Sequence, residues 1–197
     1  MTTGHLNAAQ RPNHVPGLNP VPPPNPVPRP NHVPRLNPVP RLNPVQVAPD
    51  AYAAVAGVER YLQGCGLEPS LVELVKLRAS QVNGCAFCLD MHSRDARRHG
   101  ETEQRLYLLD AWREAPIYSE REQAALAWTE CLSLVATRRA PDAEYEALTR
   151  QFSPAEIVNL TTLIGTINLW NRLAIGFQAE PGVHWAGKHR AGEGKAA

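Results

Sequence analysis

The stretch from Glu73 to His92 reads Glu-Leu-Val-Lys-Leu-Arg-Ala-Ser-Gln-Val-Asn-Gly-Cys-Ala-Phe-Cys-Leu-Asp-Met-His. The pair Asn83-Gly84 is typical of a helix C-terminus, so we expect the first helix of this stretch to end there. Cys85 then falls at the start of a second helix, which the pair His99-Gly100 is expected to end. The stretch therefore predicts two successive helices, with the cysteines at the beginning of the second.

The chain on both sides of this stretch shows the same helical pattern from Pro49 onward. A capping residue is followed three positions later by a carboxylate, then by an apolar stripe and a glycine or proline stop. The predicted helices begin near Asp50 or Pro49, Ser70, Thr102, Ser119, Asp142 and Ser153. No strand-like alternation bounded by hairpin turns competes with these helices. The predicted fold class is all-α.

The last predicted helix, from Pro154 to about Phe177, is apolar on most of its circumference. A membrane span is one interpretation of such a helix. However, Asn159, Asn168, Asn171 and Arg172 interrupt it, and such groups are costly in hydrocarbon without partners. We therefore predict a central core helix that can also contribute to a subunit contact, and no membrane association.

The N-terminal part of the chain is rich in proline and repeats itself. Pro-Asn-His-Val-Pro-Gly-Leu-Asn-Pro-Val-Pro from Pro12 returns with one change from Pro30. Fixed φ angles and missing amide donors exclude helix and sheet here. Residues 1–46 are predicted to be a disordered, locally polyproline II arm, residues 47–185 one helical domain, and residues 186–197 a flexible tail. The arm serves either as a docking ligand for an SH3-like groove or as a spacer.

Charge and cysteine content exclude several classes of protein. The formal net charge is +1 and no basic stripe is present, which disfavours a nucleic-acid partner. Four cysteines are few for a disulfide-built secreted scaffold, and no positively charged start followed by an apolar run predicts a signal peptide. We expect a protein of the reducing cytoplasm, where paired cysteines usually indicate catalysis or metal binding.

Cys85, Cys88 and His92 are related by steps of three and four, so they share one face of the second helix. A thiol at a helix N-terminus feels the positive end of the dipole, and a nearby imidazole can take its proton. A thiolate attacks an O–O bond or a disulfide, and a second cysteine one turn away can condense with the resulting sulfenic acid. If the two helices fold back on each other, Glu73 can orient His92.

Each of these residues also has a purely structural interpretation. Glu73 can be the capping-box partner of Ser70, and His92 can be a core histidine with satisfied hydrogen bonds. A structural zinc site needs four ligands at familiar spacings, and no second C-x-x-C exists, so no metal is predicted. Haem attachment would require a histidine directly after the second cysteine. We interpret Cys131 as core packing, on a face shared with Trp128 and Val135, and Cys65 as a loop thiol without an assigned role.

From these residues outward, the sequence resembles the alkylhydroperoxidase D (AhpD)-like branch of the carboxymuconolactone decarboxylase family. The resemblance spans about residue 48 to 180 and includes the later stretches Tyr-Leu-Leu-Asp-Ala-Trp-Arg-Glu-Ala-Pro and Ile-Asn-Leu-Trp-Asn-Arg-Leu-Ala-Ile. It implies an all-helical subunit in homo-oligomers, commonly trimers or hexamers. It also implies reduction of a hydroperoxide substrate without a bound cofactor, with electrons from a dithiol donor such as a lipoylated protein.

The family's proton relay corresponds to Glu73, Cys85, Cys88 and His92 in this chain. The resemblance implies that Cys88 attacks the peroxide and Cys85 resolves, whereas the helix dipole favours Cys85 as the thiolate, so the order stays open. One position departs from the pattern, because the well-studied peroxidase type has a histidine where this chain has Phe87. This difference bears on peroxide preference and rate.

The predicted function is peroxide reduction through a Cys85–Cys88 disulfide, with His92 and Glu73 as a proton relay. The main alternative is a general thiol-disulfide oxidoreductase or redox sensor, for which the same pair of cysteines would serve. Lactone decarboxylation would leave the C-x-x-C motif unexplained, because that chemistry needs no dithiol. A scaffold protein recruited through the proline-rich arm is a further alternative.

Overall fold

The computed structural model describes residues 40–183, which form nine α-helices and one short 3₁₀ helix without any strand. In chain order these are α1 (Pro44–Val47), α2 (Pro49–Leu62), α3 (Pro69–Asn83), α4 (Ala86–Arg98), α5 (Glu103–Leu108), η1 (Leu109–Ala111), α6 (Glu120–Ser133), α7 (Val135–Arg138), α8 (Asp142–Thr149) and α9 (Pro154–Gly176). The described part of the chain is all-α, which confirms the predicted fold class.

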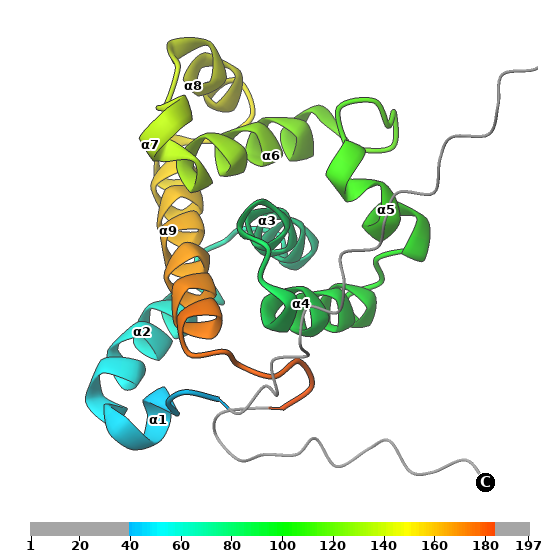
Figure 1. The fold of residues 1–197 in the computed structure, drawn as a ribbon. Coiled ribbons are helices and arrows are strands. Elements are labelled where there is room, and N and C mark those ends of the chain that lie inside the picture. The colour runs from blue at the N-terminus through cyan, green and yellow to red at the C-terminus, as the bar shows by residue number, and fades with distance from the viewer. Residues whose placement is uncertain (1–39, 184–197) are drawn as a thin grey trace, which may run out of the picture. The chain divides into compact units, whose positions relative to one another are not determined.

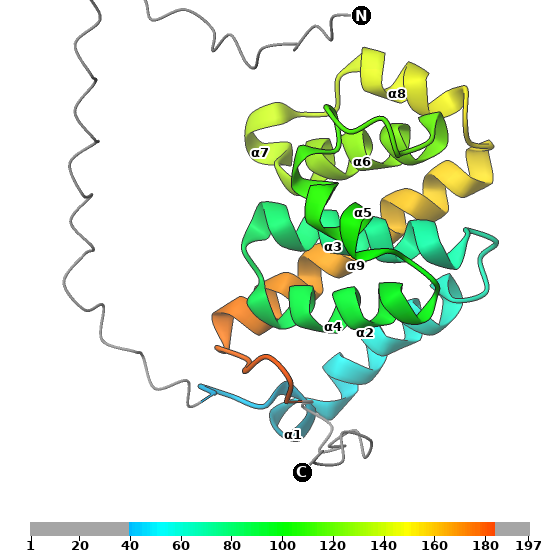
Figure 2. The same cartoon turned by 90° about the vertical axis from the view of Figure 1, so that its right-hand side faces the viewer.

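Helix α3 lies at the centre of this arrangement. Figure 1 looks along α3 and shows α4, α5, α6 and α9 around it. Its main packing partners are α4, α6 and α9, and the side chains of Leu74 and Val75 are completely buried. In Figure 2, α3 and α4 lie one above the other, with α2 behind α4. The central helix of the domain therefore leads directly into the helix that carries the cysteines.

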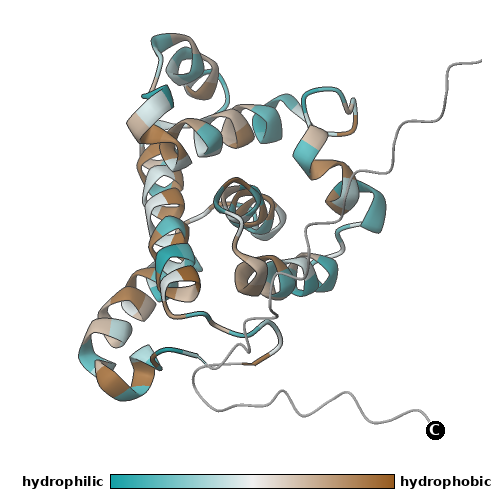
Figure 3. Ribbon diagram, in the orientation of Figure 1, coloured by the Kyte–Doolittle hydropathy of each residue, from teal (hydrophilic) through white to brown (hydrophobic). Residues whose placement is uncertain are grey.

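Helix α9 is a core helix, but only along one side. Leu160, Leu163 and Ile167 are completely buried, whereas Val158 and Leu169 are exposed. Figure 3 shows the hydrophobic residues of α9 alternating with hydrophilic ones along its length. None of the helices within residues 40–183 combines the length and the hydropathy that a membrane crossing requires. Three asparagines interrupt the apolar pattern of α9 and are nevertheless buried: Asn159, Asn168 and Asn171.

Most of the predicted helix starts are correct. Ser119 and Ser153 each form a complete capping box with the glutamate three residues later, and Thr102 caps α5. The prediction that Ser70 caps α3 is wrong, because α3 already begins at Pro69 and Glu68 occupies the cap position without a side-chain hydrogen bond. A proline in the first helical position has the required φ angle and lacks the amide that a cap would satisfy.

The folded domain also begins earlier than predicted. The interpretation of the proline-rich segment as free of helix is wrong for residues 44–46, which belong to α1. Pro44 occupies the first turn, where proline is tolerated, and the Asn43 side chain accepts a hydrogen bond from the Val45 amide. The Arg41 amide donates to the Phe177 carbonyl at 2.9 Å, which ties this segment to the end of α9. The predictions for residues 1–39 and 184–197 lie outside the described residues.

Candidate active site

The turn between α3 and α4 places Cys85 at the start of α4. Gly84 adopts a left-handed conformation (φ 69°), which ends α3, and the Cys85 amide reaches back to the Ser80 carbonyl at 2.9 Å. Cys85 is the N-cap residue of α4, and its Sγ accepts a hydrogen bond from the Cys88 amide at 3.4 Å. The sequence pattern predicted this placement correctly.

Both cysteines are free thiols in the domain interior. Each side chain is about 1% exposed, and together they pack against Ala79 of α3 and against Ile167 and Ala174 of α9. Large molecules therefore cannot reach either sulfur directly. Access to the dithiol depends on a cavity beside it.

The two thiols differ in acidity because they are hydrogen-bonded to each other. The Cys88 thiol donates to Cys85 Sγ, which lowers the pKa of Cys85 although burial opposes this change. The same hydrogen bond raises the pKa of Cys88, as do burial and the negative charge on Cys85. The reduced pair is therefore expected to ionise at Cys85, while Cys88 keeps its proton.

Glu73 and His92 meet between α3 and α4. The Glu73 carboxylate Oε2 lies 2.8 Å from His92 Nδ1, and both side chains are buried. An ionised carboxylate only accepts hydrogen bonds, so it places the proton of a neutral His92 on Nδ1 and leaves Nε2 as the acceptor. The predicted contact between these two residues is present. Glu73 is used in this contact and not as a capping partner of Ser70.

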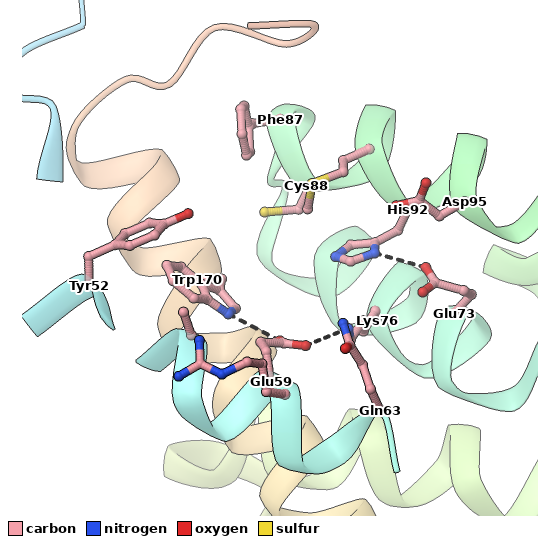
Figure 4. Close-up of a pocket in the computed structure, with 13 residues that line it drawn as sticks. Tyr52, Glu59, Gln63, Glu73, Lys76, Phe87, Cys88, His92, Asp95 and Trp170 are labelled. Carbon is pink, nitrogen blue, oxygen red and sulfur yellow. Dashed lines mark hydrogen bonds and ion pairs between the residues drawn. The ribbon is translucent and has the colours of Figure 1, made fainter. Parts of the chain in front are cut away.

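A cavity of about 430 Å³ opens between α2, α3, α4 and α9. Cys88 and His92 line it, whereas Cys85 does not. Figure 4 shows the Cys88 sulfur directed into this space and the His92 ring below it, hydrogen-bonded to Glu73 on the far side. Phe87, Tyr52 and Trp170 form an aromatic wall, and the rest of the lining is Ala56, Glu59, Arg60, Gln63, Glu73, Lys76, Met91 and Asp95.

The wall opposite Cys88 contains a partly buried ion pair that the sequence pattern did not indicate. Glu59 of α2 accepts from Lys76 Nζ at 2.8 Å and from Trp170 Nε1 at 3.1 Å. These contacts join α2 to α3 and α9 across the cavity. Each of these residues is unremarkable within its own helix, so no local pattern could have indicated that they meet.

Three side chains at the cavity have a geometry that can hold a divalent ion. Glu73, His92 and Asp95 each offer one ligand atom, and these atoms lie within 4.8 Å of one another. However, His92 Nδ1 already contacts Glu73, and Asp95 is paired with Arg98 at 2.8 Å. A metal ion would have to displace both interactions.

The other two cysteines lie apart from this site. Cys65 is half-buried in the loop after α2, where its carbonyl accepts a hydrogen bond from the Asn159 side chain. Cys131 is completely buried in α6, and burial raises the pKa of its thiol. The predicted core position of Cys131 is confirmed. The prediction that Cys131 shares a helix face with Val135 is wrong, because α6 ends at Ser133 and Val135 is exposed.

The chain is similar to proteins of one family. Residues 48–130 match the model of the carboxymuconolactone decarboxylase family. The uncharacterized protein YdfG of Bacillus subtilis is 42% identical over 130 residues, which are 66% of this chain and 88% of that protein.

Solved structures show the same fold. A protein of unknown function from Agrobacterium tumefaciens, proposed to be the antioxidant defence protein AhpD, superimposes with a TM-score of 0.71 at 45% identity, over 74% of this chain and 99% of that one. A peroxidase-related protein with an alkylhydroperoxidase AhpD core from Ralstonia eutropha JMP134 has a TM-score of 0.62 at 20% identity, over 70% of this chain and 73% of that one. At 20% identity, the similarity to the Ralstonia eutropha protein shows a common fold and nothing more.

Proposed function

Because this chain belongs to the carboxymuconolactone decarboxylase family and is AhpD-like, we propose that it is a thiol-dependent peroxidase that cycles through a Cys85–Cys88 disulfide. One observation carries the proposal: Cys88 and His92 line the same cavity, and Glu73 is hydrogen-bonded to the far side of the His92 ring. This arrangement provides a nucleophile, a base and a group that orients the base.

In the first step, Cys88 Sγ attacks the terminal oxygen of the hydroperoxide and the O–O bond breaks. Cys88 needs a base, because its hydrogen bond to Cys85 and its burial raise the pKa of its thiol. His92 Nε2 takes the thiol proton and transfers it to the departing alkoxide, so the products are a sulfenic acid on Cys88 and an alcohol. Glu73 stabilises the positive charge that His92 carries in between.

In the second step, the Cys85 thiolate attacks the Cys88 sulfenic acid. In the reduced pair, the hydrogen bond from the Cys88 thiol lowers the pKa of Cys85, which favours formation of the Cys85 thiolate before the sulfenic acid appears. Hydroxide leaves and takes up the proton that Cys85 released to solvent when it ionised. The net reaction converts one dithiol and one hydroperoxide into one disulfide, one alcohol and one water. This assignment gives the attacking role to Cys88 and the resolving role to Cys85.

The burial of both sulfurs restricts the reductant that regenerates the dithiol. Because neither sulfur is exposed, a donor must enter through the cavity. A slender dithiol, such as a reduced lipoyl group carried on a protein arm, meets this requirement better than a dithiol in the body of a folded protein does. A cytoplasmic location and a homo-oligomeric assembly remain part of this proposal.

The alternative function is a thiol-disulfide relay or redox sensor. The lowered pKa of Cys85 favours exchange with disulfides, but its side chain is buried and does not line the cavity. We therefore prefer a small hydroperoxide over a protein disulfide as the oxidant.

Steady-state consumption of cumene hydroperoxide, with dihydrolipoamide as donor, tests the proposal. Turnover is expected to be lost in Cys88→Ser and lowered in His92→Ala. Cys131→Ala is the matched control, since Cys131 is a buried cysteine outside the cavity, and it should turn over like the unmodified protein. If the unmodified protein shows no turnover while its Cys85–Cys88 disulfide still forms and is reduced, the peroxidase proposal is wrong and the relay function is preferred.

A further inference from the structure

Asn171 is a completely buried amide in the C-terminal third of α9. Burying an amide costs free energy unless its donors and acceptors are paired. A core helix would therefore favour an apolar residue here. The hydrogen bonds of Asn171 explain why this position is polar.

The neighbours of Asn171 fix the orientation of its amide. Its Oδ1 accepts from Asn83 Nδ2 at 2.9 Å, and its Nδ2 donates to Ser80 Oγ at 3.1 Å. Ser80 can only accept in this contact, because its own proton is donated to the Lys76 carbonyl at 2.7 Å. The oxygen of Asn171 thus faces the end of α3, and one of its two N–H groups is used by Ser80.

Asn171 lies on the face of α9 that packs against the dithiol, because Ile167 and Ala174 stand one turn before and one turn after it. The surface of α9 around Asn171, formed by Ile167 and Ala174, packs directly against Cys85 and Cys88. A hydrogen bond from the Asn171 side chain acts to lower the pKa of both the Cys85 and the Cys88 thiol. A single donor that reaches both sulfurs can stabilise a negative charge on either of them.

We propose that Asn171 is a positioning residue whose second amide N–H stabilises the singly ionised Cys85/Cys88 dithiol, held in place by Ser80 and Asn83. The role of Asn171 in turnover rests on the proposed function, whereas the effect of Asn171 on the pKa of the dithiol does not. The donor would support the Cys85 thiolate in the resting enzyme and the charge that develops on Cys88 as it attacks the peroxide. It has no charge to stabilise once the disulfide has formed.

The test is a titration of the reduced dithiol in Asn171→Leu, which is similar in size but has no donor. The signal is the ultraviolet thiolate absorbance of each protein minus that of its Cys85→Ser/Cys88→Ser counterpart. A hydrogen bond to a charged group corresponds to a shift of about 1 to 2 pKa units, so the first pKa of the pair should rise by that amount. Alkylation of the pair by iodoacetamide at neutral pH should slow by about tenfold.

Asn159→Leu is the matched control. Asn159 is a buried asparagine of the same helix, about 18 Å along the axis from Asn171, and it pairs with Tyr61 and the Cys65 carbonyl. This variant should lose stability without any change in the thiol titration. Asn171→Asp, which keeps the shape of the side chain but replaces the donor with an acceptor, serves if the leucine variant does not fold, and it should raise the first pKa at least as much.

An unchanged first pKa in either folded Asn171 variant would overturn the inference. The titration contains no peroxide, so its result is independent of whether the protein is a peroxidase. A shifted titration in a protein that never turns over peroxide would support the role of Asn171 and refute the proposed function. Normal turnover with an unshifted titration would support the proposed function and refute the role of Asn171.

Discussion

Replacing Glu73 with glutamine removes the negative charge that orients His92 while keeping the shape of the side chain. The hydrogen bond between Oε2 and Nδ1 is 2.8 Å long, and both side chains are less than 10% exposed, so solvent weakens it little. A hydrogen bond to a charged group contributes about 1.5 to 3 kcal/mol and a neutral one about 1 kcal/mol. The glutamine variant retains the neutral bond, so the difference of about 0.5 to 2 kcal/mol corresponds to a loss of about 2- to 30-fold in kcat/KM.

Peroxide consumption with a saturating dithiol donor measures this loss. Glu68→Gln is the matched control, because Glu68 immediately precedes the same helix but is exposed and paired with Arg121. The control should stay within about twofold of the unmodified protein, and thermal melting should show that both variants are folded. A folded Glu73→Gln protein with kcat/KM within twofold of the unmodified protein would refute the assignment of Glu73 as the residue that orients His92.

Three further predictions concern the sulfurs, the core and the N-terminal segment. Cys85→Ser should accumulate a sulfenic acid on Cys88 after one equivalent of peroxide, detected by dimedone labelling, and labelling at any other cysteine would contradict the assigned order. Glu130→Gln should lower the free energy of unfolding by about 3 kcal/mol at neutral pH, measured by urea denaturation, because this buried carboxylate binds three arginines and a tryptophan. Burial favours a raised pKa for Glu130, but the hydrogen bonds from its partners hold that pKa below the usual value. The stabilisation by Glu130 should therefore be present above about pH 4.3 and disappear as the pH falls through the lowered folded-state pKa. An equal loss of stability in Glu130→Gln at all pH values would argue against this role of the carboxylate. Deleting residues 1–39 should leave Tm and turnover unchanged, whereas deleting residues 1–47 should lower Tm because it also removes α1 and the hydrogen bond to Phe177.

The sequence indicated the local features of the site because each has a short-range cause. Asn83-Gly84 ends α3 through a left-handed glycine, and the spacing of Cys85, Cys88 and His92 follows from helical periodicity. The capping boxes at Ser119 and Ser153 are likewise local. Elements whose geometry is decided within a few residues were therefore predictable.

The errors and omissions have physical causes of two kinds. Ser70 was placed at a cap because its side chain suits that position, but a proline one residue earlier already starts the helix. The contact of Glu59 with Lys76 and the contact of Asn171 with Ser80 depend on tertiary packing between separate helices. In the sequence, Asn171 is a polar exception in an apolar helix, and this exception is the local signal of its contacts.

The order of the two cysteines required the structure as well. The helix dipole and the hydrogen bond between the thiols favour Cys85 as the thiolate, whereas the cavity reaches only Cys88 among the two. Acidity and accessibility therefore assign different residues to the two steps. A base-assisted attack of Cys88, followed by attack of the Cys85 thiolate, is consistent with both properties.

A single-turnover experiment tests the proposed disulfide cycle most directly. Reduced protein is mixed anaerobically with less than one equivalent of cumene hydroperoxide and no donor, and the cumyl alcohol and the cysteine pairs in its peptides are quantified by mass spectrometry. One alcohol should form for each Cys85–Cys88 disulfide, with Cys65 and Cys131 remaining reduced. Alcohol without this disulfide, or unconsumed peroxide in the presence of the reduced dithiol, would contradict the cycle.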